Sequence, residues 1–471
     1  MKLESIDIEA TIEKTKRLLE EDQGISPSLK TSIELLLLLV TLLLNRLGLN
    51  SSNSSKPPSS DPNRQKKQKE PGAKKPGGQK GHNGTTLKKV ANPDIIEEIP
   101  LDPTTLPPGD YKEAGYDARQ VIDIDISQIV TEYRAQILED ANGKHYAASF
   151  PDGVTRPVQY GINIKAQSVY LSQYQLIPYS RIEETFHDQA EIPVSGGSIF
   201  NFNEEAYEKL EAFEDIVRSK LIQSDLCHTD ETGINIDGKR RWLHCVSNDQ
   251  WTFFHPHEKR GIEAMNAMGI LPEFTGILCH DHWKPYFRFS CDHALCNAHH
   301  LRELQRAWEQ DKQEWAKDLR ALLIEINAAV EDAGGQLAPQ TDSHYRQKYK
   351  NLLERAQNKC PPPDENQRKG KRGRLKRSKS RNLLERLIEY ENETLRFMED
   401  KRVPFTNNRG ENDIRMTKVQ QKISGCFRSE KGAAIFCRVR SYLSTCKKHG
   451  VMASEALRLL FAGKFPAFLN E

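Results

Sequence analysis

The chain has no strong excess of either charge, and this limits the kinds of partner that the whole molecule can bind. Its 471 residues include 68 Lys and Arg and 66 Asp and Glu, which give a formal net charge of +2. A uniformly basic protein is excluded, so any affinity for nucleic acid must come from local runs of charge. Apolar residues make up only 37%, but the length still allows a sizeable core and about two to four folding units.

Long apolar runs and a disulfide framework are also missing. The longest apolar run, Leu35–Leu44, is shorter than the roughly 20 residues that cross a bilayer, so no membrane partner is expected. Met1–Glu21 is acidic and polar, unlike a signal peptide. The nine cysteines are odd in number and scattered, which fits a reducing cytoplasm better than a set of disulfides.

The segment 30–48 predicts a helix with an apolar seam. The seam residues recur at spacings of 4, 3, 4 and 3, and they are Ile33, Leu37, Val40, Leu44 and Leu47. A heptad seam either packs on the helix's own domain or pairs with another subunit, and about two heptads do not decide between these alternatives.

Two polar segments follow this helix. Asn50–Asp61 is rich in Ser and Pro, which is typical of a linker. Arg64–Lys80 carries seven basic residues and one acidic residue, interrupted by Pro and Gly. We expect a basic arm that binds phosphates without reading sequence, with a solubilising linker as the alternative.

Residues 90–180 predict a small mixed region. Val121–Ile126 alternates apolar and acidic residues with period two, which predicts a strand, and Gly161–Leu176 predicts an amphipathic helix. The region contains no cysteine, so a zinc knuckle is not supported there.

Residues 220–290 predict three strands, a helix and a fourth strand. The strand-like runs are Leu221–Cys227, Arg241–Val246, Trp251–Phe254 and Phe274–Asp281, with a turn at Asn248–Asp249 and a helix over Gly261–Leu271. The first run leads into an acidic, Gly-ended turn that places Asp230 at the tip of its strand, and Asp281 ends the fourth. This order predicts a ribonuclease-H-like α/β core, in which the first and fourth strands are neighbours and Asp230 and Asp281 project together.

Two adjacent carboxylates repel one another and need a cation between them. Hard oxygen ligands without a thiolate suit Mg²⁺ or Mn²⁺, and a third acid would complete a site for two ions in phosphoryl transfer. Each Asp taken alone is more simply a turn residue or a helix cap. The third acid therefore decides the interpretation.

Glu411 is the best third acid. It lies in Thr406–Lys418, where Asn407 or Asn408 can cap a helix. Glu411 shares one helix face with three cations at spacings of 4, 3 and 4, which are Arg415, Lys418 and Lys422. The face predicts a metal ligand beside cations that hold a DNA backbone, and the alternative is a surface ion ladder.

These residues resemble the large catalytic protein of the insertion-sequence-66 transposases over nearly the whole chain. The matching segments are Asn53–Asp61, Gln159–Gly161, Leu176–Arg181, His228–Thr232, Cys296–Leu304, Val403–Asn408 and Lys422–Arg428. The resemblance implies a DDE transposase with a ribonuclease-H-like core, and its acid triad falls on Asp230, Asp281 and Glu411.

The resemblance also implies an activity and partners. We expect cutting at element ends and joining of the freed 3′-hydroxyl to target DNA, with two Mg²⁺ or Mn²⁺ ions. The expected partners are double-stranded DNA, further copies of the chain and accessory proteins of the same element, in the cytoplasm of a bacterium at its nucleoid. The alternatives are a catalytically inactive, transposase-derived DNA-binding protein and a nuclease that cuts without joining.

Three departures from the family pattern concern the site. The Cys-rich zinc segment before the core is absent, His282 stands where the family favours Gly, and Gly410 stands where it favours Ala. Cys296 and His299 match a Cys-x-x-His motif of several DDE groups. We expect them to support the site, with a zinc site as the less favoured alternative, built from Cys291, Cys296, His299 or His300.

The 129 residues between Asp281 and Glu411 imply an insertion. Leu301–Asp332 and Tyr345–Asn358 have helical periodicity, and Arg368–Arg381 carries nine basic residues and no acid. We expect DNA contacts in this loop from Arg372, Arg374, Lys376 and Arg377. A C-terminal helix that packs on the core is marked by Ile435, Val439, Tyr442 and Cys446.

The predicted organisation is α/β with added segments. The segments are an N-terminal leucine-rich helix (1–49), a Ser/Pro-rich and basic linker arm (50–89), a small mixed domain (90–160), a helical DNA-binding or connecting region (161–219), the first part of the core (220–300), a helical insertion with a basic loop (301–402) and the C-terminal part of the core with the Glu411 helix (403–471).

Overall fold

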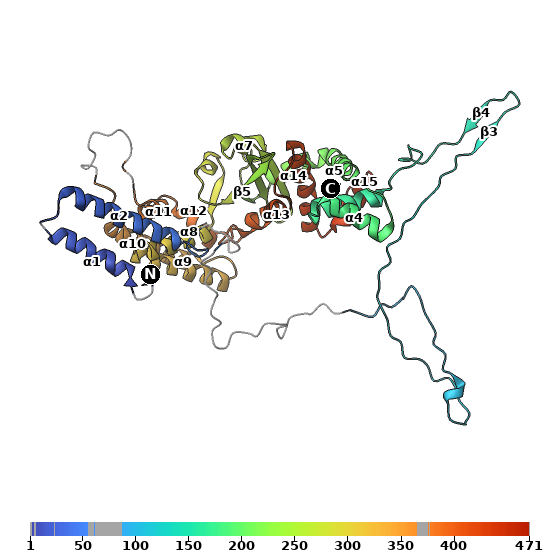
Figure 1. The fold of residues 1–471 in the computed structure, drawn as a ribbon, viewed down its shortest axis with the longest axis horizontal. Helices are drawn as coiled ribbons and strands as arrows, with labels where there is room; N and C mark the ends of the chain where they lie inside the picture. Colours follow the sequence, from blue (N-terminus) through green and yellow to red (C-terminus); the bar gives the residue numbers. More distant parts are fainter. Residues whose placement is uncertain are drawn as a thin grey trace. The chain divides into compact units, whose positions relative to one another are not determined.

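The computed structural model describes residues 2–3, 6–22, 24–54, 61, 87–364, 375 and 377–470. The predicted basic arm Arg64–Lys80 and the predicted DNA contacts Arg372, Arg374 and Lys376 lie outside the described residues. The chain divides into two units, and the larger one contains the sheet (Figure 1). Both predicted aspartates belong to this larger unit. The larger unit is Met1–Arg64, Phe150–Glu184 and Val194–Glu471; the smaller is Gln65–Ser149 and Thr185–Pro193.

A five-stranded mixed sheet forms the centre of the larger unit. Its order is β7-β6-β5-β8-β9, and the strands are β5 (Leu226–Ile236), β6 (Lys239–Ser247), β7 (Thr252–His257), β8 (Ile277–His280) and β9 (Asp292–Leu295). The first three strands form an antiparallel meander, whereas β8 and β9 run parallel to β5. The prediction that the first and fourth strands are neighbours is confirmed, because β5 pairs with β8.

The strand that carries Asp230 is longer than the sequence predicted. Leu221 belongs to helix α6 (Glu211–Ile222), and β5 begins only at Leu226 and continues to Ile236. Asp230 therefore lies within a strand and not at its tip, which corrects the prediction. The physical reason is that the residues after Asp230 keep an alternating pattern of burial and pair with β6 throughout.

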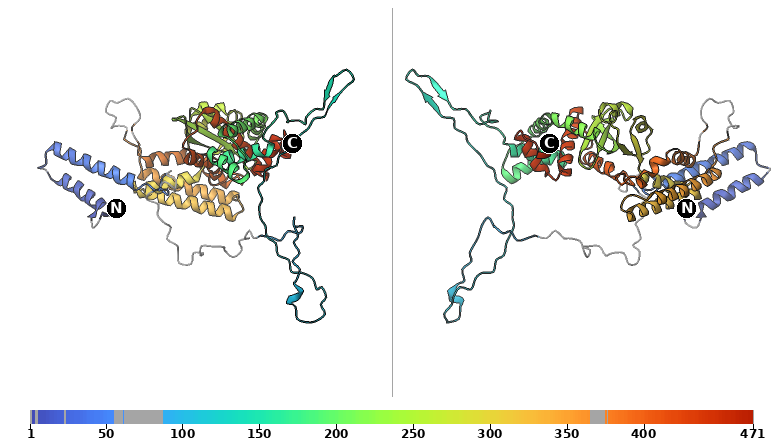
Figure 2. Two further views of the ribbon diagram at one scale, coloured as in Figure 1. Left: turned by 45° about the vertical axis from the view of Figure 1, so that its right-hand side comes forward. Right: turned by 180° about the vertical axis from the view of Figure 1, so that it is seen from behind.

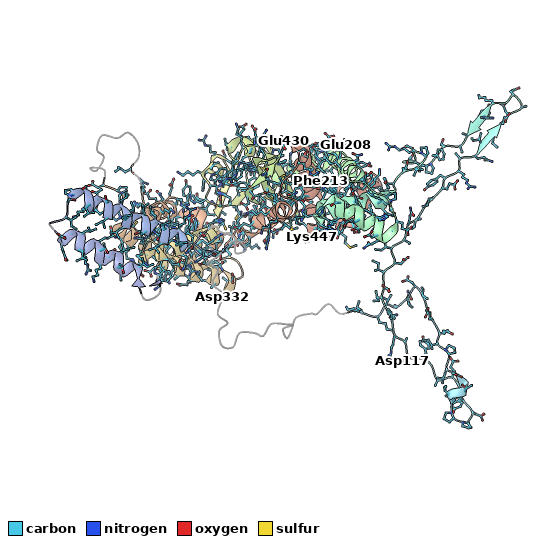
Figure 3. All side chains as sticks on the ribbon, viewed as in Figure 1. Asp117, Glu208, Phe213, Asp332, Glu430 and Lys447 are labelled. Carbon is cyan, nitrogen blue, oxygen red and sulfur yellow. The ribbon has the colours of Figure 1, made fainter. Side chains whose placement is uncertain are left out.

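Two helices pack directly on the meander. Helix α13 (Asn408–Ser424) contacts β5 and β6, and α14 (Glu430–Lys448) lies against β7. Figure 3 labels Glu430 and Lys447 near the two ends of α14. The predicted packing of this C-terminal helix is confirmed, since all four marker residues are buried: Ile435, Val439, Tyr442 and Cys446.

Helix α14 also covers the open edge of β7. The Ser441 Oγ accepts a hydrogen bond from the backbone N–H of Phe254 at 2.9 Å, and the Thr445 Oγ1 accepts one from Thr252 at 3.1 Å. An edge strand otherwise exposes unpaired backbone groups. Two hydroxyls of one helix thus take the place of a sixth strand.

A helical insertion joins β9 to α13, as predicted. It consists of α8 (Asn297–Glu309), α9 (Glu314–Asp332), α10 (Pro339–Lys359), α11 (Lys379–Glu389) and α12 (Glu391–Leu395). Helices α9 and α10 lie side by side in both views of Figure 2. Their facing residues form one hydrophobic cluster that also takes in Ile277 and Cys279 of β8, so the insertion is packed on the sheet.

The remaining described elements are mostly helical. They are β1 (Lys2–Leu3), β2 (Ile6–Asp7), β3 (Ile137–Glu139), β4 (His145–Ala147), α1 (Ile8–Glu21), α2 (Pro27–Leu47), α3 (Ile162–Val169), α4 (Tyr179–Ala190), α5 (Gly196–Lys209), α7 (Ile262–Ala267) and α15 (Ala453–Phe461). The predicted helix Gly161–Leu176 is found as α3 and a π-helical turn, Tyr170–Tyr174.

The strand predicted for Val121–Ile126 is wrong. These residues are exposed and belong to neither a helix nor a strand, because no segment in the described part of the chain pairs with them. Strands β3 and β4 form a hairpin in the smaller unit. Over residues 87–160 no described side chain is buried, so the predicted small domain at 90–160 stays a prediction.

The leucine-rich helix is confirmed as α2, and its surroundings are unusual. It contacts α1, and its residues Ile33, Leu37 and Leu44 are half-buried, but none of its residues is buried. Among the described residues, α2 is the helix that is long and apolar enough to cross a membrane, with a mean hydropathy of 1.7. One such helix is weak evidence for a membrane span, so the absence of a membrane partner stays a prediction.

Candidate active site

Asp230 and Asp281 lie level with one another on the two central strands. The parallel register pairs Leu226 with Ile277 and His228 with Cys279. Continued by two residues, this register sets Asp230 opposite Asp281, which directly follows β8. Residues opposite one another on neighbouring strands share a face of the sheet, so the two carboxylates belong to one cluster.

Burial and like charge raise the pKa values of both carboxyl groups. Burial raises the pKa of Asp230 to about 7, and the charges of Glu231, Asp281 and Glu411 act in the same direction. Burial and the charge of Glu231 raise the pKa of Asp281 to about 6, although Asp281 accepts a hydrogen bond from the backbone N–H of Trp283. Carboxyl groups with such pKa values favour either a proton or a metal cation.

Glu411 lies in the first turn of α13, next to the start of α8. Its Oε1 is 3.8 Å from the Nδ1 of His299 and 3.8 Å from an Nη of Arg302. Its charge is among those that raise the pKa of Asp230. Among the described residues, however, the ligand atoms that lie within 4.8 Å of Glu411 belong to Cys296 and His299 and not to Asp230 or Asp281, so the convergence of all three acids on shared ions stays a prediction.

Cys296 and His299 lie beside Glu411. Their ligand atoms and a Glu411 carboxylate oxygen all lie within 4.8 Å of one another. Burial lowers the pKa of His299 to about 4, so the imidazole is neutral and has a free lone pair. Among the described residues, the Glu411 Oε1 and the His299 Nδ1 are both buried without a hydrogen-bond partner. Buried polar atoms without partners at a place that also holds a thiol fit a bound cation, beside the Arg302 guanidinium that lies 3.8 Å from the same oxygen.

The other two residues of the zinc alternative are engaged differently. The Nδ1 of His300 forms a hydrogen bond with the Oδ1 of Asn297 at 3.0 Å. Cys291 comes directly before β9 and is not in the group formed by Cys296, His299 and Glu411. Three ligand types at this one place fit a metal, but carboxylate oxygens dominate the wider cluster.

A buried acid that the sequence prediction missed lies next to Asp230. The Glu231 side chain is only 2% exposed, and its carboxylate accepts hydrogen bonds from Arg260 at 2.5 and 2.9 Å and from the Tyr286 hydroxyl. The Arg260 guanidinium lies over the rings of Trp283, at 4.0 Å, and Trp242, at 5.0 Å. Arg260 also lowers the pKa of Asp281, so a fixed cation adjoins the cluster. No spacing rule points to this pair, because 29 residues separate Glu231 from Arg260.

Asn407 links the elements that carry the acids. Its side chain bridges His228 and Thr229, which precede Asp230, and its backbone N–H donates to the Cys296 Sγ at 3.1 Å. The sequence predicted Asn407 or Asn408 as a helix cap. Asn407 occupies the cap position of α13, but its side chain makes no capping hydrogen bond.

Two of the three departures from the family pattern, His282 and Gly410, have defined neighbours in the structure. The ring of His282 packs edge-on against Tyr390 at 4.5 Å, and neither of its nitrogens has a hydrogen-bond partner among the described residues. Gly410 lies against the Asn407 side chain, where an added Cβ would come within 3.2 Å of the amide. Neither residue displaces a predicted metal ligand.

The predicted cationic face of α13 is exposed. Arg415, Lys418 and Lys422 are exposed, whereas Ile414 and Thr417 of the same helix are buried against the sheet. Within the predicted basic loop, Arg377 is described and forms an ion pair with Glu385. Three cations therefore face outward from the helix that carries Glu411.

The larger unit is thus a mixed α/β fold with two largely buried aspartates on neighbouring strands and a row of exposed cations on α13. The sequence model of the Transposase IS66 family matches residues 157–435, more than half of the chain. The chain belongs to the IS66 family of transposases, and its role is that of a DNA-acting enzyme of an insertion element. Residues 3–88 match a family of unknown function, DUF6444, and no curated protein matches the chain.

Proposed function

We propose that this protein cleaves the ends of its insertion element and joins the 3′-hydroxyls to target DNA by two-metal phosphoryl transfer. The observation that carries the proposal is the level placement of Asp230 and Asp281 on neighbouring parallel strands, with a pKa of Asp230 raised first by burial and then by the charges of Glu231, Asp281 and Glu411. Two largely buried aspartates side by side have no evident stabilising role, since like charges in a low dielectric repel.

The sheet supports a ribonuclease-H-like assignment of the core. An antiparallel meander is followed by two strands parallel to its first strand, and the first strand is central in the order β7-β6-β5-β8-β9. This is the order that the sequence argument used to bring Asp230 and Asp281 together. The glutamate then comes from a helix, α13, that packs on the same central strand.

The three carboxylates would hold Mg²⁺ or Mn²⁺, which prefer oxygen ligands. Bound ions would activate the attacking water or 3′-hydroxyl and stabilise the leaving oxygen. His299 and Arg302 lie 3.8 Å from Glu411 and would orient its carboxylate. The exposed cations of α13 would bind the DNA backbone next to the acids, and they are Arg415, Lys418 and Lys422.

Joining two element ends requires that both be held in one assembly, so we infer a homo-oligomer. The exposed leucines of α2 offer an apolar surface for a second copy, among them Leu36 at 59% exposure and Leu43 at 59%. Accessory proteins of the element and a location at the bacterial nucleoid remain part of the same proposal.

The test uses purified protein, labelled double-stranded DNA that carries the element ends, and Mg²⁺. Strand-transfer products are expected from the natural chain, and Asp230→Asn, Asp281→Asn and Glu411→Gln should abolish them while DNA binding persists. Asp318→Asn, an exposed position on α9, is the matched control. Binding without chemistry would indicate an inactive DNA-binding protein, and cleavage without joining would indicate a nuclease.

A further inference from the structure

The junction between β5 and α13 is held by one buried side chain. Asn407 is 2% exposed, and its Oδ1 lies 2.7 Å from the Nδ1 of His228. Its Nδ2 donates to the backbone carbonyl of Thr229 at 2.8 Å, which fixes the orientation of the amide. The Oδ1 must then accept from the His228 Nδ1–H, so both ends of the amide bind β5 immediately before Asp230.

The backbone of the same residue binds two further elements. Its N–H donates to the Sγ of Cys296, at the start of α8. Its carbonyl accepts the backbone N–H of Glu411 at 3.2 Å, which is the first hydrogen bond of α13. Asn407 thus connects β5, the start of α8 and the helical turn that carries Glu411.

The local chemistry makes this arrangement unexpected. Asn in the residue before a helix ordinarily accepts from a backbone N–H of the first turn, which stabilises the helix. Here the side chain gives up that bond and reaches across to the sheet. Residues that depart from a local rule in favour of a long-range contact are frequently found at functional sites.

From these contacts we propose that Asn407 is a positioning residue for the acid cluster, which fixes Glu411 relative to Asp230. It acts through the two segments that it joins, because Asp230 follows Thr229 directly and Glu411 lies one helical turn after Asn407. A shift of about 1 Å in such a ligand is enough to weaken a site whose geometry must be pre-formed.

Gly410 supports this interpretation. An added Cβ at Gly410 would lie 3.2 Å from both the Oδ1 and the Nδ2 of Asn407, so the amide fills the space beside the helix. The segment before Asn407 is also anchored, since the Phe405 carbonyl accepts the backbone N–H of Asn297 at 3.1 Å. The amide therefore has one packed position and not several.

The inference rests on the proposed function where it predicts metal binding. Its second test, amide hydrogen exchange, is made without metal. Asn407→Ala and Asn203→Ala are compared with the natural chain in full-length protein. Asn203 is a matched control because it is fully buried on α5 and makes two side-chain hydrogen bonds, with Ser172 and Tyr179. Asn408→Ala is the exposed neighbour control.

The first measurement is Mn²⁺ binding, monitored through the electron paramagnetic resonance signal of the free ion. Asn407→Ala should weaken binding about 10- to 100-fold, which is the usual effect of removing a residue that orients a ligand. Both control variants should stay within about twofold of the natural chain, since their ligand geometry is intact. Equal Mn²⁺ affinity in Asn407→Ala and the natural chain would overturn the proposal.

The second measurement is amide hydrogen exchange by mass spectrometry in metal-free protein. Faster exchange over 226–232 and 408–414 in Asn407→Ala, but not in Asn203→Ala, is the expected result. If the natural chain bound no Mn²⁺ sensitive to Asp230→Asn, the metal proposal would fail, and exchange alone would decide the role of Asn407. Unchanged exchange over both segments would then reject it.

Discussion

Replacing Asp230 with Asn should stabilise the metal-free protein at neutral and alkaline pH. The folded structure raises the pKa of Asp230 from 3.8 to about 7, chiefly through burial and then through the charges of Glu231 and Asp281. The unfolded chain lacks these surroundings, so its Asp230 loses the proton near the ordinary pKa. Between these two pKa values the folded state holds a proton that the unfolded state has released, and folding becomes less favourable as the pH rises.

The size of the effect follows from the pKa difference. One pKa unit corresponds to about 1.4 kcal/mol, so the ionisation cost is near zero below pH 4, about 1.5 kcal/mol at pH 5 and about 4 kcal/mol at pH 8. Asn cannot ionise, yet its Oδ1 can still accept the backbone N–H of Glu231 that Asp230 accepts at 2.9 Å. The variant should therefore gain stability that grows between pH 4 and pH 7 and then levels off.

The assay is thermal unfolding in EDTA at pH 5 and pH 8, with Asp318→Asn as the exposed control. One kcal/mol moves the midpoint by roughly 2–4 °C in domains of moderate size, and by less in a larger unit. Adding Mg²⁺ at about 100 times its dissociation constant should return about 2.7 kcal/mol to the natural chain and little to the variant. A gain that is equal at both pH values, or no gain at pH 8, would refute the account of a strained acid cluster.

Three further perturbations test other parts of the structure. Ser441→Ala should destabilise the protein by about 1–3 kcal/mol in urea unfolding, because the buried N–H of Phe254 loses its partner; an unchanged midpoint would show that water replaces the hydroxyl. Arg260→Gln should lower the free energy of unfolding by about 2–4 kcal/mol, because it leaves the Glu231 carboxylate buried without its cation. A double variant that adds Glu231→Gln should recover part of this loss. Additive losses from the two substitutions would argue against a specific pair. Lys418→Ala should lower the salt dependence of DNA binding by about one unit of slope with the fold unchanged; an unaltered slope would place the DNA elsewhere.

The sequence allowed prediction of the arrangement of the sheet because the relevant patterns are local. Short apolar runs mark strands, and a fixed chain order restricts which strands can be neighbours. The pairing of β5 with β8 and the helix that carries Glu411 both followed from such patterns. The length of β5 was underestimated, because the acidic residues 230 and 231 interrupt the apolar pattern although the backbone pairing with β6 continues.

Long-range polar contacts could not be predicted in the same way. Glu231 and Arg260 meet because a turn after β7 returns the chain to β5, and no spacing in the sequence encodes that return. The strand predicted for Val121–Ile126 is wrong for the opposite reason. A period of two describes an extended backbone, but it supplies no partner strand. Local periodicity predicts an element, and only the fold determines its neighbours.

Asn407 shows how these two kinds of information combine at the candidate site. The sequence correctly places it next to the start of a helix, and from propensity alone its side chain would be expected to cap that helix. The structure gives the same amide a different use, because the sheet offers a donor and an acceptor, His228 and Thr229, at the matching separation. A helix whose first turn is held to a strand in this way carries Glu411 at a fixed distance from that strand. The stability that α13 gives up at its cap is therefore exchanged for a defined position of its acid, which an enzyme that needs three converging carboxylates requires and a DNA-binding protein does not.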